Sequence, residues 1–146
     1  MSTVKPIPEG FRTVTPYVIC ERAAEVIEFV KRAFGAQLVF QMKNPDGSIG
    51  HSEIRIGDSM IMLSSAREQW KAMPTMVHLY VDNVDAWYAK AIEAGAEPVM
   101  PVADQFYGDR SGGVKDVAGN YWWMATHVKD VSEEEMKRLH SQKSGQ

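Results

Sequence analysis

His51, Glu53 and His78 are the side chains whose types could carry out acid–base chemistry or hold a metal ion. His51 and Glu53 stand two residues apart in HSEIRI, so in a strand both side chains would project from one face. A histidine beside a carboxylate can act as general base and acid, and two histidines with one carboxylate form a familiar divalent-metal site. The alternative is that both histidines are hydrogen-bonded lining residues and that Glu53 is solvated or paired with Arg55.

Aromatic side chains offer a different chemistry, the stacking of a planar ligand. The sequence GNYWWMATH, residues 119–127, contains two adjacent tryptophans, and adjacent residues of a strand point to opposite faces. Alternation along this strand predicts that Trp122 lies in the core and that Trp123 and Tyr121 face a cavity. Nearby, Arg110 could hold a substrate anion through its planar guanidinium, or it could pair locally with Asp109.

The elements that must position these residues fall into two similar halves. In the first half, Ala23, Ile27, Val30 and Phe34 recur at the spacing of one helix face, and Gly35 follows where a helix would end. NPDG at 44–47 is strong turn chemistry. The half is therefore predicted as a strand over 13–20, a helix over 21–34, and strands over 36–43, 51–56 and 59–65.

The second half repeats that order. We predict a strand over 75–81, a helix over 84–94 ending at Gly95, a broken edge strand over 97–105, and a last hairpin of 110–117 with 120–127. The second helix should bury Val84, Tyr88, Ala91 and Ile92. Shifting the flanking strands by 61 residues superimposes Met62 on Trp123, and a repeat of this length indicates a duplicated module.

This organisation predicts a single domain over residues 1–131. Its first module spans about 11–65, a linker spans 65–74, and its second module spans about 75–128. Residues 132–146 form a tail with a short helix, because Ser132 and Glu135 have the spacing of a capping box. The two-residue period of the strands assigns Val14, Pro16, Val18 and Cys20 to the core.

The opposite faces of the strands mix aromatic, thioether and polar side chains, which suits a concave lining better than an open solvent face. Met62 and Met76 could be ordinary packing or part of an adaptable binding surface. The residues predicted to line this cleft are Thr15, Tyr17, Met62, Met76, His78, Tyr80, Arg110, Tyr121 and Trp123.

Composition excludes several classes of protein. The chain has 146 residues, a net charge of −3 and charged residues of both signs, so it has no electrostatic footprint for nucleic acid or anionic membrane. Its apolar runs are too short to span a bilayer, and its N-terminal residues do not resemble a signal peptide. Cys20 is the one cysteine and is expected to be buried and unreactive. These features predict a cytoplasmic protein.

The paired β-α-β-β-β modules, each with a glycine that ends its helix, resemble the vicinal oxygen chelate superfamily of glyoxalases, bleomycin resistance proteins and dioxygenases. The segments HLYVDNVDA, YGDRSGGVKD and GNYWWMATHV are similar to its PhnB-like branch. The resemblance covers about residues 11–131. It implies a glyoxalase-like α+β fold in which the two modules form an incomplete barrel with helices outside, and a homodimer whose clefts involve both chains.

The resemblance also implies where a metal would bind. Metal-dependent members of the superfamily take four ligands from the first and last strands of each module, and these positions here are Thr15, Met62, Met76 and Trp123. Two thioethers, a hydroxyl and an indole are poor ligands for a hard or borderline divalent ion. The usual metal site is therefore predicted to be absent and no cofactor is expected, although a displaced metal at His51 and His78 is an alternative.

Two functional classes follow from these residues. The first is a protein that binds an undetermined small molecule, planar or cationic, on its tyrosine and tryptophan side chains, as resistance proteins of this superfamily do. The second is a lyase, isomerase or dioxygenase that uses a displaced metal or His51, Glu53 and His78 as acid and base. A methyltransferase is disfavoured, because no strand leads through a glycine-rich turn into a helix.

Overall fold

The computed structural model describes residues 3–144 and contains two successive modules, each built as strand, helix and three strands. The first module comprises β1 (Tyr17–Cys20), α1 (Ala23–Phe34), β2 (Gln37–Lys43), β3 (Ile49–Ile56) and β4 (Ser59–Ser65). The second comprises β5 (Met76–Tyr80), α2 (Val84–Glu93), β6 (Glu97–Asp104), β7 (Asp109–Lys115) and β8 (Tyr121–His127), and helix α3 (Glu133–Ser144) follows. The predicted α+β fold class is confirmed.

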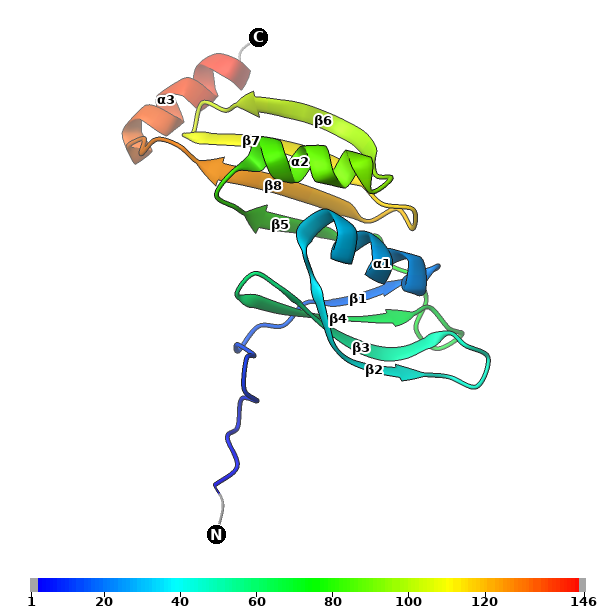
Figure 1. Cartoon of the computed structure of the whole chain (residues 1–146). Helices are drawn as coiled ribbons and strands as arrows, with labels where there is room; N and C mark the ends of the chain where they lie inside the picture. Colours follow the sequence, from blue (N-terminus) through cyan, green and yellow to red (C-terminus); the bar gives the residue numbers. More distant parts are fainter. Residues whose placement is uncertain (1–2, 145–146) are drawn as a thin grey trace.

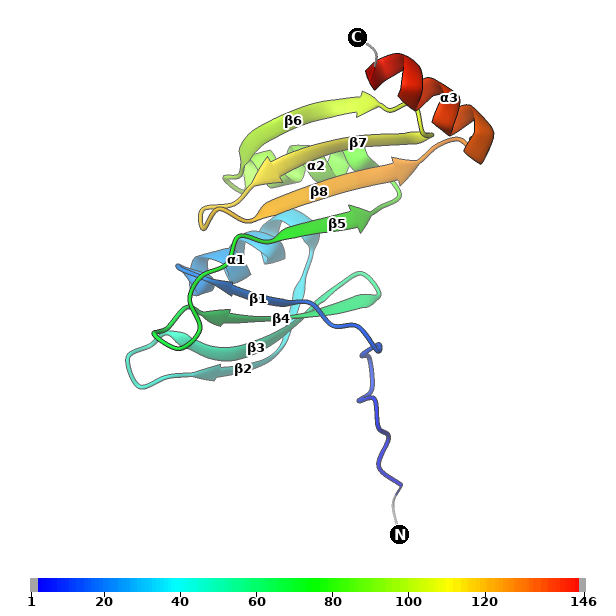
Figure 2. The ribbon, with the colours of Figure 1, turned by 180° about the vertical axis from the view of Figure 1, so that it is seen from behind.

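Each module folds its strands into one four-stranded sheet, with order β1-β4-β3-β2 in the first and β5-β8-β7-β6 in the second. The first and last strands of each module pair in parallel. The two sheets lie side by side with β1 and β5 as inner edges, and the described strands form no closed barrel (Figure 1). Helices α1 and α2 cover the same side of both sheets. We call the other side the open face (Figure 2).

Helix α1 forms because its apolar residues recur on one face and its end is marked by glycine. Its buried side chains are Ala23, Val26, Ile27, Phe29, Val30, Ala33 and Phe34. Gly35 adopts φ 64°, a left-handed conformation that glycine reaches without a Cβ clash, and its N–H bonds to Lys31 O. The predicted helix end at this glycine is confirmed.

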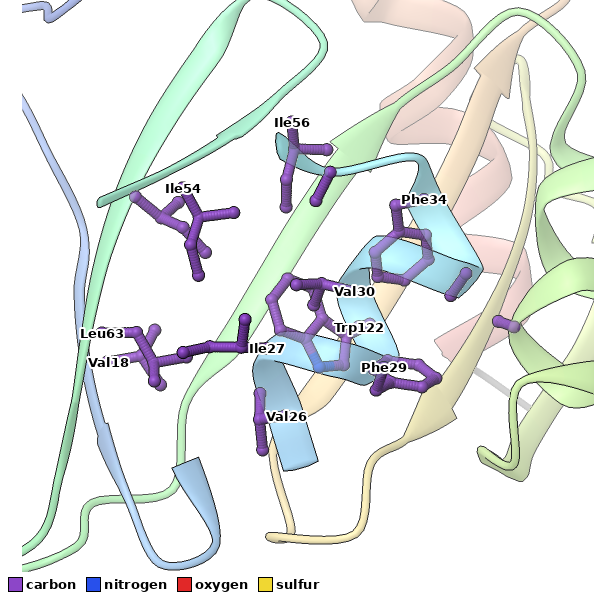
Figure 3. Packing of buried hydrophobic residues seen from close by; sticks show 14 of the residues in the cluster. Val18, Val26, Ile27, Phe29, Val30, Phe34, Ile54, Ile56, Leu63 and Trp122 are labelled. Carbon is purple, nitrogen blue, oxygen red and sulfur yellow. The ribbon is translucent and has the colours of Figure 1, made fainter. Parts of the chain in front are cut away.

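The core joins the two modules beneath the helices. Trp122 of β8 is fully buried and packs against Phe34 and Phe29 of α1, with ring centroids 5.4 and 6.5 Å apart. Val18, Ile54 and Leu63 of the first sheet are buried on the other side of α1 (Figure 3). The core is therefore continuous from one module to the other, with α1 between them.

Helix α2 contacts α1 with a slightly different face from the predicted one. Val84 and Ala91 are buried, but Ile92 is 36% exposed, so its assignment to the core is wrong. The helix instead directs Trp87 toward α1, where its ring stacks on Phe34 at a centroid distance of 5.8 Å and an interplanar angle of 18°. The aromatic stack between the helices sets the rotation of α2.

The first strand is shorter than predicted. Pairing begins at Tyr17, which lies opposite Met62 of β4, and the last contact before it is a bond from Met62 N–H to Pro16 O. Val14 is 79% exposed and Pro16 is also exposed, so their assignment to the core is wrong. Residues 13–16 run off the sheet, in part because proline has no N–H with which to extend the ladder.

Two other predicted features are confirmed. Strand β6, which contains Pro98 and Pro101, is an edge strand with register shifts. A tight turn joins β7 to β8, where Asp116 accepts bonds from the backbone N–H groups of Ala118 and Asn120. Within the described residues, no helix is long and apolar enough to cross a membrane.

Helix α3 packs on the second module. The Ser132 hydroxyl accepts a bond from the Glu135 N–H at 3.1 Å, which is one of the two bonds of the predicted capping box, whereas the Glu135 carboxylate accepts from Arg138. The ring of His140 lies 6.1 Å from that of Phe106, in the loop before β7. The tail that was predicted over 132–146 is thus helical through Ser144, and its last two residues lie outside the described part of the chain.

Candidate functional site

The open face of the first sheet brings three of the predicted residues into one hydrogen-bonded chain. Tyr17 Oη lies 2.9 Å from His51 Nδ1, and His51 Nε2 lies 3.1 Å from Glu53 Oε2. Strand register explains the contact, because Tyr17 of β1 pairs with Met62 of β4, which pairs with Glu53 of β3. Glu53 is thus the β3 residue in line with Tyr17. The Tyr17 side chain crosses β4 and contacts His51, two residues before Glu53.

The imidazole ring of His51 is contacted on several sides. The ring of Tyr17 lies 5.6 Å from that of His51, and the ring of Phe40 on β2 lies 6.3 Å away. The His51 and Glu53 side chains retain only 20% and 23% of their exposure, whereas Tyr17 is 43% exposed. The phenol is thus the member of the chain that a solute can reach most easily.

Two pockets adjoin the hydrogen-bonded group of Tyr17, His51 and Glu53. The first, which we call the linker pocket, has a volume of about 440 Å³ and lies between β1 and the linker that follows β4. Its lining is Tyr17, Ile19, Ser64, Arg67, Trp70 and Met73. The second has a volume of about 390 Å³ and lies between the segment before β1, residues 6–15, and the first sheet. Its lining includes Thr15, Glu53 and Met62. Both volumes are in the range of small-molecule sites. Tyr17 lines the first pocket and Glu53 the second, with His51 between them.

The open face of the second sheet carries an aromatic surface centred on Trp123. Trp123 pairs with Gly113 of β7 on one side and His78 of β5 on the other. A Cβ atom placed on Gly113 would overlap the six-membered ring of Trp123, so the indole lies across the glycine. Glycine at this position permits the close approach. As predicted from the sequence, Trp123 and the buried Trp122 point to opposite faces.

Other predicted residues extend this surface. The rings of His78 and Tyr80 lie 4.9 Å apart on β5, and Lys115 Nζ lies 5.8 Å from the ring of Tyr121. Met76 and Tyr80 are 61% and 67% exposed. These side chains are therefore open to solvent in the single chain rather than enclosed in a cleft.

A second hydrogen-bonded cluster lies at the end of the same sheet and was not predicted. The buried carboxylate of Asp109 accepts a bond from the Tyr80 hydroxyl at 2.7 Å and lies 2.8 Å from His127 Nδ1. His127 Nε2 lies 2.8 Å from Asp130. The bond to Asp109 is the main cause that raises the pKa of Tyr80, and likewise the pKa of His127, to which Asp130 adds.

The cluster adjoins a buried hydroxyl. Ser111 Oγ, two residues along β7 from Asp109, has no hydrogen-bond partner among the described residues. Ser111 pairs with Ala125 of β8, which pairs with Tyr80. The phenol of Tyr80 thus extends over a row of small residues to reach Asp109, and this cluster ties β5, β7 and the segment after β8 together.

Arg110 does not join the open face, which differs from the prediction. Its guanidinium donates to both oxygens of Asp85 on α2, at 2.8 and 3.0 Å, and to Asp104 at 3.3 Å. The side chain therefore lies on the helix side of β7. It does not pair with Asp109, because Asp109 points to the opposite face, as alternation requires.

Cys20 is buried, as expected. Burial raises the pKa of its thiol to about 11, and one cysteine cannot form a disulfide within this chain. The thiol is therefore kept in its protonated, weakly nucleophilic form at neutral pH.

The four positions that the resemblance assigns to metal ligands carry side chains that are poor ligands for a divalent ion. Thr15 precedes β1, and its hydroxyl lies 3.4 Å from Arg12 O. Met62 and Met76 supply thioethers, and Trp123 supplies an indole that lies on Gly113. Neither hydroxyl, thioether nor indole suits a divalent ion that prefers imidazole and carboxylate, so the residues present do not fit the metal of the superfamily.

The alternative metal site at His51 and His78 is also not assembled. His51 belongs to β3 of the first sheet and His78 to β5 of the second. Both ring nitrogens of His51 are already engaged, by Tyr17 and Glu53. Between residues 3 and 144, no group of three or more His, Cys, Asp or Glu side chains is placed to hold a metal ion.

Comparisons with known proteins agree with this architecture. An uncharacterized protein of Mycobacterium bovis, Mb0911c, is 33% identical over 135 residues, which cover 85% of this chain and 89% of that protein. Among solved structures, TioX from Micromonospora sp. ML1 is similar with a TM-score of 0.65 at 23% identity, covering 79% of this chain and 99% of TioX. A PhnB protein of Bacillus cereus, described as a putative 3-demethylubiquinone-9 3-methyltransferase, is similar with a TM-score of 0.64 at 14% identity, covering 79% of this chain and 99% of its own.

These two structures show a shared fold. The sequence model of the Glyoxalase/Bleomycin resistance protein/Dioxygenase superfamily matches residues 12–124, which include both modules apart from the last residues of β8. The predicted resemblance to the vicinal oxygen chelate proteins is confirmed, and the similarity to the PhnB protein shows a shared fold. The chain belongs to the Glyoxalase/Bleomycin resistance protein/Dioxygenase superfamily.

Proposed function

We propose that this protein binds a small planar molecule on the aromatic open face of its second module, without the metal of its superfamily. The observation that carries the proposal is the position of Trp123. Its indole occupies the place of a metal ligand and lies across Gly113, beside His78. A flat indole supported by backbone offers a rigid surface for stacking, because little side-chain freedom remains to be lost on binding.

The charge of the ligand follows from the surrounding rings. The faces of indole and phenol rings attract cations, and Trp123, Tyr121 and Tyr80 lie on one face of the sheet. The chain as a whole has a net charge of −3, which favours the approach of a cation. A planar aromatic cation therefore suits the site better than an anion.

We infer that two copies of the chain complete the cleft. In a single chain, Met76, Tyr80 and Tyr17 remain substantially exposed on the open face, an arrangement that a second copy would cover. A two-fold dimer would give two equivalent clefts that involve both chains. Light scattering should give the mass of a dimer at micromolar concentration, and a monomer would contradict this inference.

A second candidate function is supported by the chain of Tyr17, His51 and Glu53. A phenol, an imidazole and a carboxylate in hydrogen-bonding order are suited to general acid–base chemistry. This arrangement suits an isomerase or lyase, because their proton transfers can be carried out by these side chains alone.

The binding proposal can be tested with acriflavine, a planar tricyclic cation, by following its fluorescence anisotropy as protein is added. Trp123→Ala should weaken binding at least about tenfold, which corresponds to about 1.4 kcal/mol, whereas Trp123→Phe should retain part of the affinity. Trp87→Phe is the matched control, since Trp87 lies on the helix side against Phe34. Equal affinity in wild type and Trp123→Ala, or an equal loss in Trp87→Phe, would overturn the proposal.

A further inference from the structure

The two modules each contain a tyrosine that reaches across its sheet, and the two phenols end on different groups. In the first module, Tyr17 reaches His51 at 2.9 Å. In the second, Tyr80 reaches Asp109 at 2.7 Å. The geometry is equivalent in the two modules. Tyr17 is in line with Glu53 of β3 and contacts the residue two positions before it, and Tyr80 is in line with Ser111 of β7 and does the same.

The protons of the first contact can be assigned from its partners. An ionised Glu53 can only accept, so the imidazole of His51 donates through Nε2–H. The Nδ1 atom then has a free lone pair and accepts from the hydroxyl of Tyr17. Glu53 therefore fixes the tautomer that allows His51 to take the proton of the phenol.

The contact in the second module instead holds the proton on its tyrosine. The carboxylate of Asp109 raises the pKa of Tyr80, first because it accepts the hydrogen bond of the protonated phenol and also because loss of that proton would place two negative charges together. Asp109 is also held by His127. Tyr80 is therefore a structural tyrosine, and it provides an internal reference for the behaviour of Tyr17.

We propose that Tyr17, His51 and Glu53 form a proton relay. Tyr17 is the catalytic acid–base residue of the linker pocket, His51 accepts the phenolic proton, and Glu53 positions His51. The substrate class is a small carboxylate with an acidic C–H beside a carbonyl group. Tyr17 touches the substrate, and His51 and Glu53 act through it.

The linker pocket has the features that such a substrate requires. It is lined by Tyr17, Ile19, Ser64, Arg67, Trp70 and Met73 and has a volume of about 440 Å³. The guanidinium of Arg67 makes no ion pair with any residue between 3 and 144 and is suited to a carboxylate.

The linker itself is tied to the sheet beside the relay. Met73 N–H bonds to Ile19 O at 3.1 Å, and Ala66 N–H bonds to Cys20 O at 3.0 Å. The backbone of Arg67 pairs with that of Trp70 in both directions. The apolar side chains of this linker therefore have a fixed place next to the phenol of Tyr17.

The reaction step is a coupled transfer of two protons. The substrate C–H bond breaks as its proton moves to Tyr17 Oη, and the phenolic O–H bond breaks as its proton moves to His51 Nδ1. The products are an enolate, whose charge Arg67 can balance, and an imidazolium, whose charge Glu53 balances. Reversal of the two transfers returns a proton to carbon, so the step needs no other reactant.

This inference rests on the second candidate function, the acid–base chemistry of Tyr17, His51 and Glu53, and is independent of the binding proposal. The relay lies in the first module, and the stacking surface around Trp123 lies in the second. A Trp123→Ala variant that no longer binds acriflavine should retain the reactivity of Tyr17, so the two proposals fail separately.

The relay can be tested by labelling the protein with 4-(fluorosulfonyl)benzoate, an anionic reagent that sulfonylates activated phenols. The phenolic oxygen bonds to sulfur, fluoride leaves, and the proton passes to His51. Peptide mass spectrometry should show Tyr17 labelled at least about tenfold faster than Tyr80, although Tyr80 is the more exposed of the two at 67% against 43%. His51→Gln should slow Tyr17 to the rate of Tyr80 without changing the rate of Tyr80 itself.

Two outcomes of the labelling experiment would overturn the relay. One is a rate at Tyr17 that does not exceed that at Tyr80, and the other is an unchanged rate at Tyr17 in His51→Gln. The ring ¹⁵N shifts of His51 give an independent readout of the positioning role of Glu53. A protonated Nε2 and an unprotonated Nδ1 are expected, and a proton on Nδ1 would also overturn the relay.

The substrate class is tested by proton exchange. In D₂O, the C–H signals beside the carbonyl of 2-oxobutyrate and oxaloacetate are followed by ¹H NMR with wild type and with Tyr17→Phe. Faster loss of either signal with wild type supports the catalytic role. Equal rates with both proteins would overturn the assignment of this substrate class, and the labelling result would still decide on the relay.

Discussion

Replacement of the two adjacent tryptophans should damage the protein in two different ways. Trp122 is fully buried between β8 and α1, packs against Phe34 and Phe29, and donates its indole N–H to Asp116 at 2.8 Å. Truncation of a large buried aromatic side chain costs about 3–5 kcal/mol. Loss of a hydrogen bond to a carboxylate costs a further ~1–3 kcal/mol.

These magnitudes are large relative to the stability of a small domain, which is about 5–15 kcal/mol. We therefore expect Trp122→Ala to be mostly unfolded, and Trp122→Phe, which mainly loses the bond to Asp116, to unfold about 2 kcal/mol more easily than wild type. Trp123 lies on the open face, so Trp123→Ala should cost only about 1 kcal/mol. Urea unfolding followed by circular dichroism measures these differences.

The control is the order of the variants rather than any single value. If Trp123→Ala proves less stable than Trp122→Phe, the register of β8 used here is inverted. In that case Trp123 would be the core residue, and both the stacking surface and the loss of the metal ligand at this position would have to be withdrawn.

Three further predictions concern other residues. Gly113→Ala should weaken acriflavine binding as Trp123→Ala does, because a Cβ there displaces the indole. Cys20 should react with a thiol reagent only after unfolding, because burial raises its pKa to about 11. His127 has a raised pKa through Asp109, so its charged form stabilises the fold fully below its unfolded pKa of about 6.5. This contribution is lost as pH rises through the higher folded value, so His127→Asn should lower the urea midpoint more at pH ~5.5 than at pH ~9.

Each of these predictions has a contradicting result. Undiminished binding by Gly113→Ala would show that the indole orientation is unimportant. Rapid modification of Cys20 in the native protein would show that its side chain is accessible. An effect of His127→Asn that grows toward alkaline pH would show that the neutral imidazole, rather than the charged one, makes the favourable contact with Asp109.

The periodicity of apolar residues was sufficient to predict the elements and the duplication. Gly35 marked the end of α1, and alternation placed Trp122 and Trp123 on opposite faces, because both signals are local in sequence. The error at Val14 arose because alternation alone does not show where a strand begins to pair. Ile92 was misplaced because its exposure depends on the stack of Trp87 with Phe34, which belongs to the packing between helices.

The side-chain clusters were harder to predict because they depend on register between strands. Tyr17 and His51 are far apart in sequence and meet only through the pairing of β1 with β4 and of β4 with β3. The contact of Asp109 with His127 was predictable in principle. Ala118 lies midway between them, nine residues from each. A hairpin that turns at Ala118 therefore places Asp109 opposite His127.

The helix-side position of Arg110 shows a similar limit. A guanidinium in a glycine-flanked loop is a reasonable ligand for an anion, but two acidic residues from α2 and β6 surround it in the structure. Asp104 is the β6 neighbour of Arg110 and lies six residues before it, but Asp85 on α2 is 25 residues away and nothing in the sequence suggests that pair. Arg110 therefore serves to attach α2 to the second sheet.

The proposed binding of a ligand without the metal of the superfamily can be tested by the binding of divalent ions. The thermal unfolding of protein purified without added metal should be measured with and without excess manganese, zinc or nickel. An ion that binds the native state stabilises it by about 4 kcal/mol at a thousandfold excess over its dissociation constant. With Thr15, Met62, Met76 and Trp123 at the ligand positions, the account predicts an unchanged unfolding temperature. A large increase that His51→Ala or His78→Ala abolishes would contradict it and would establish a displaced metal site.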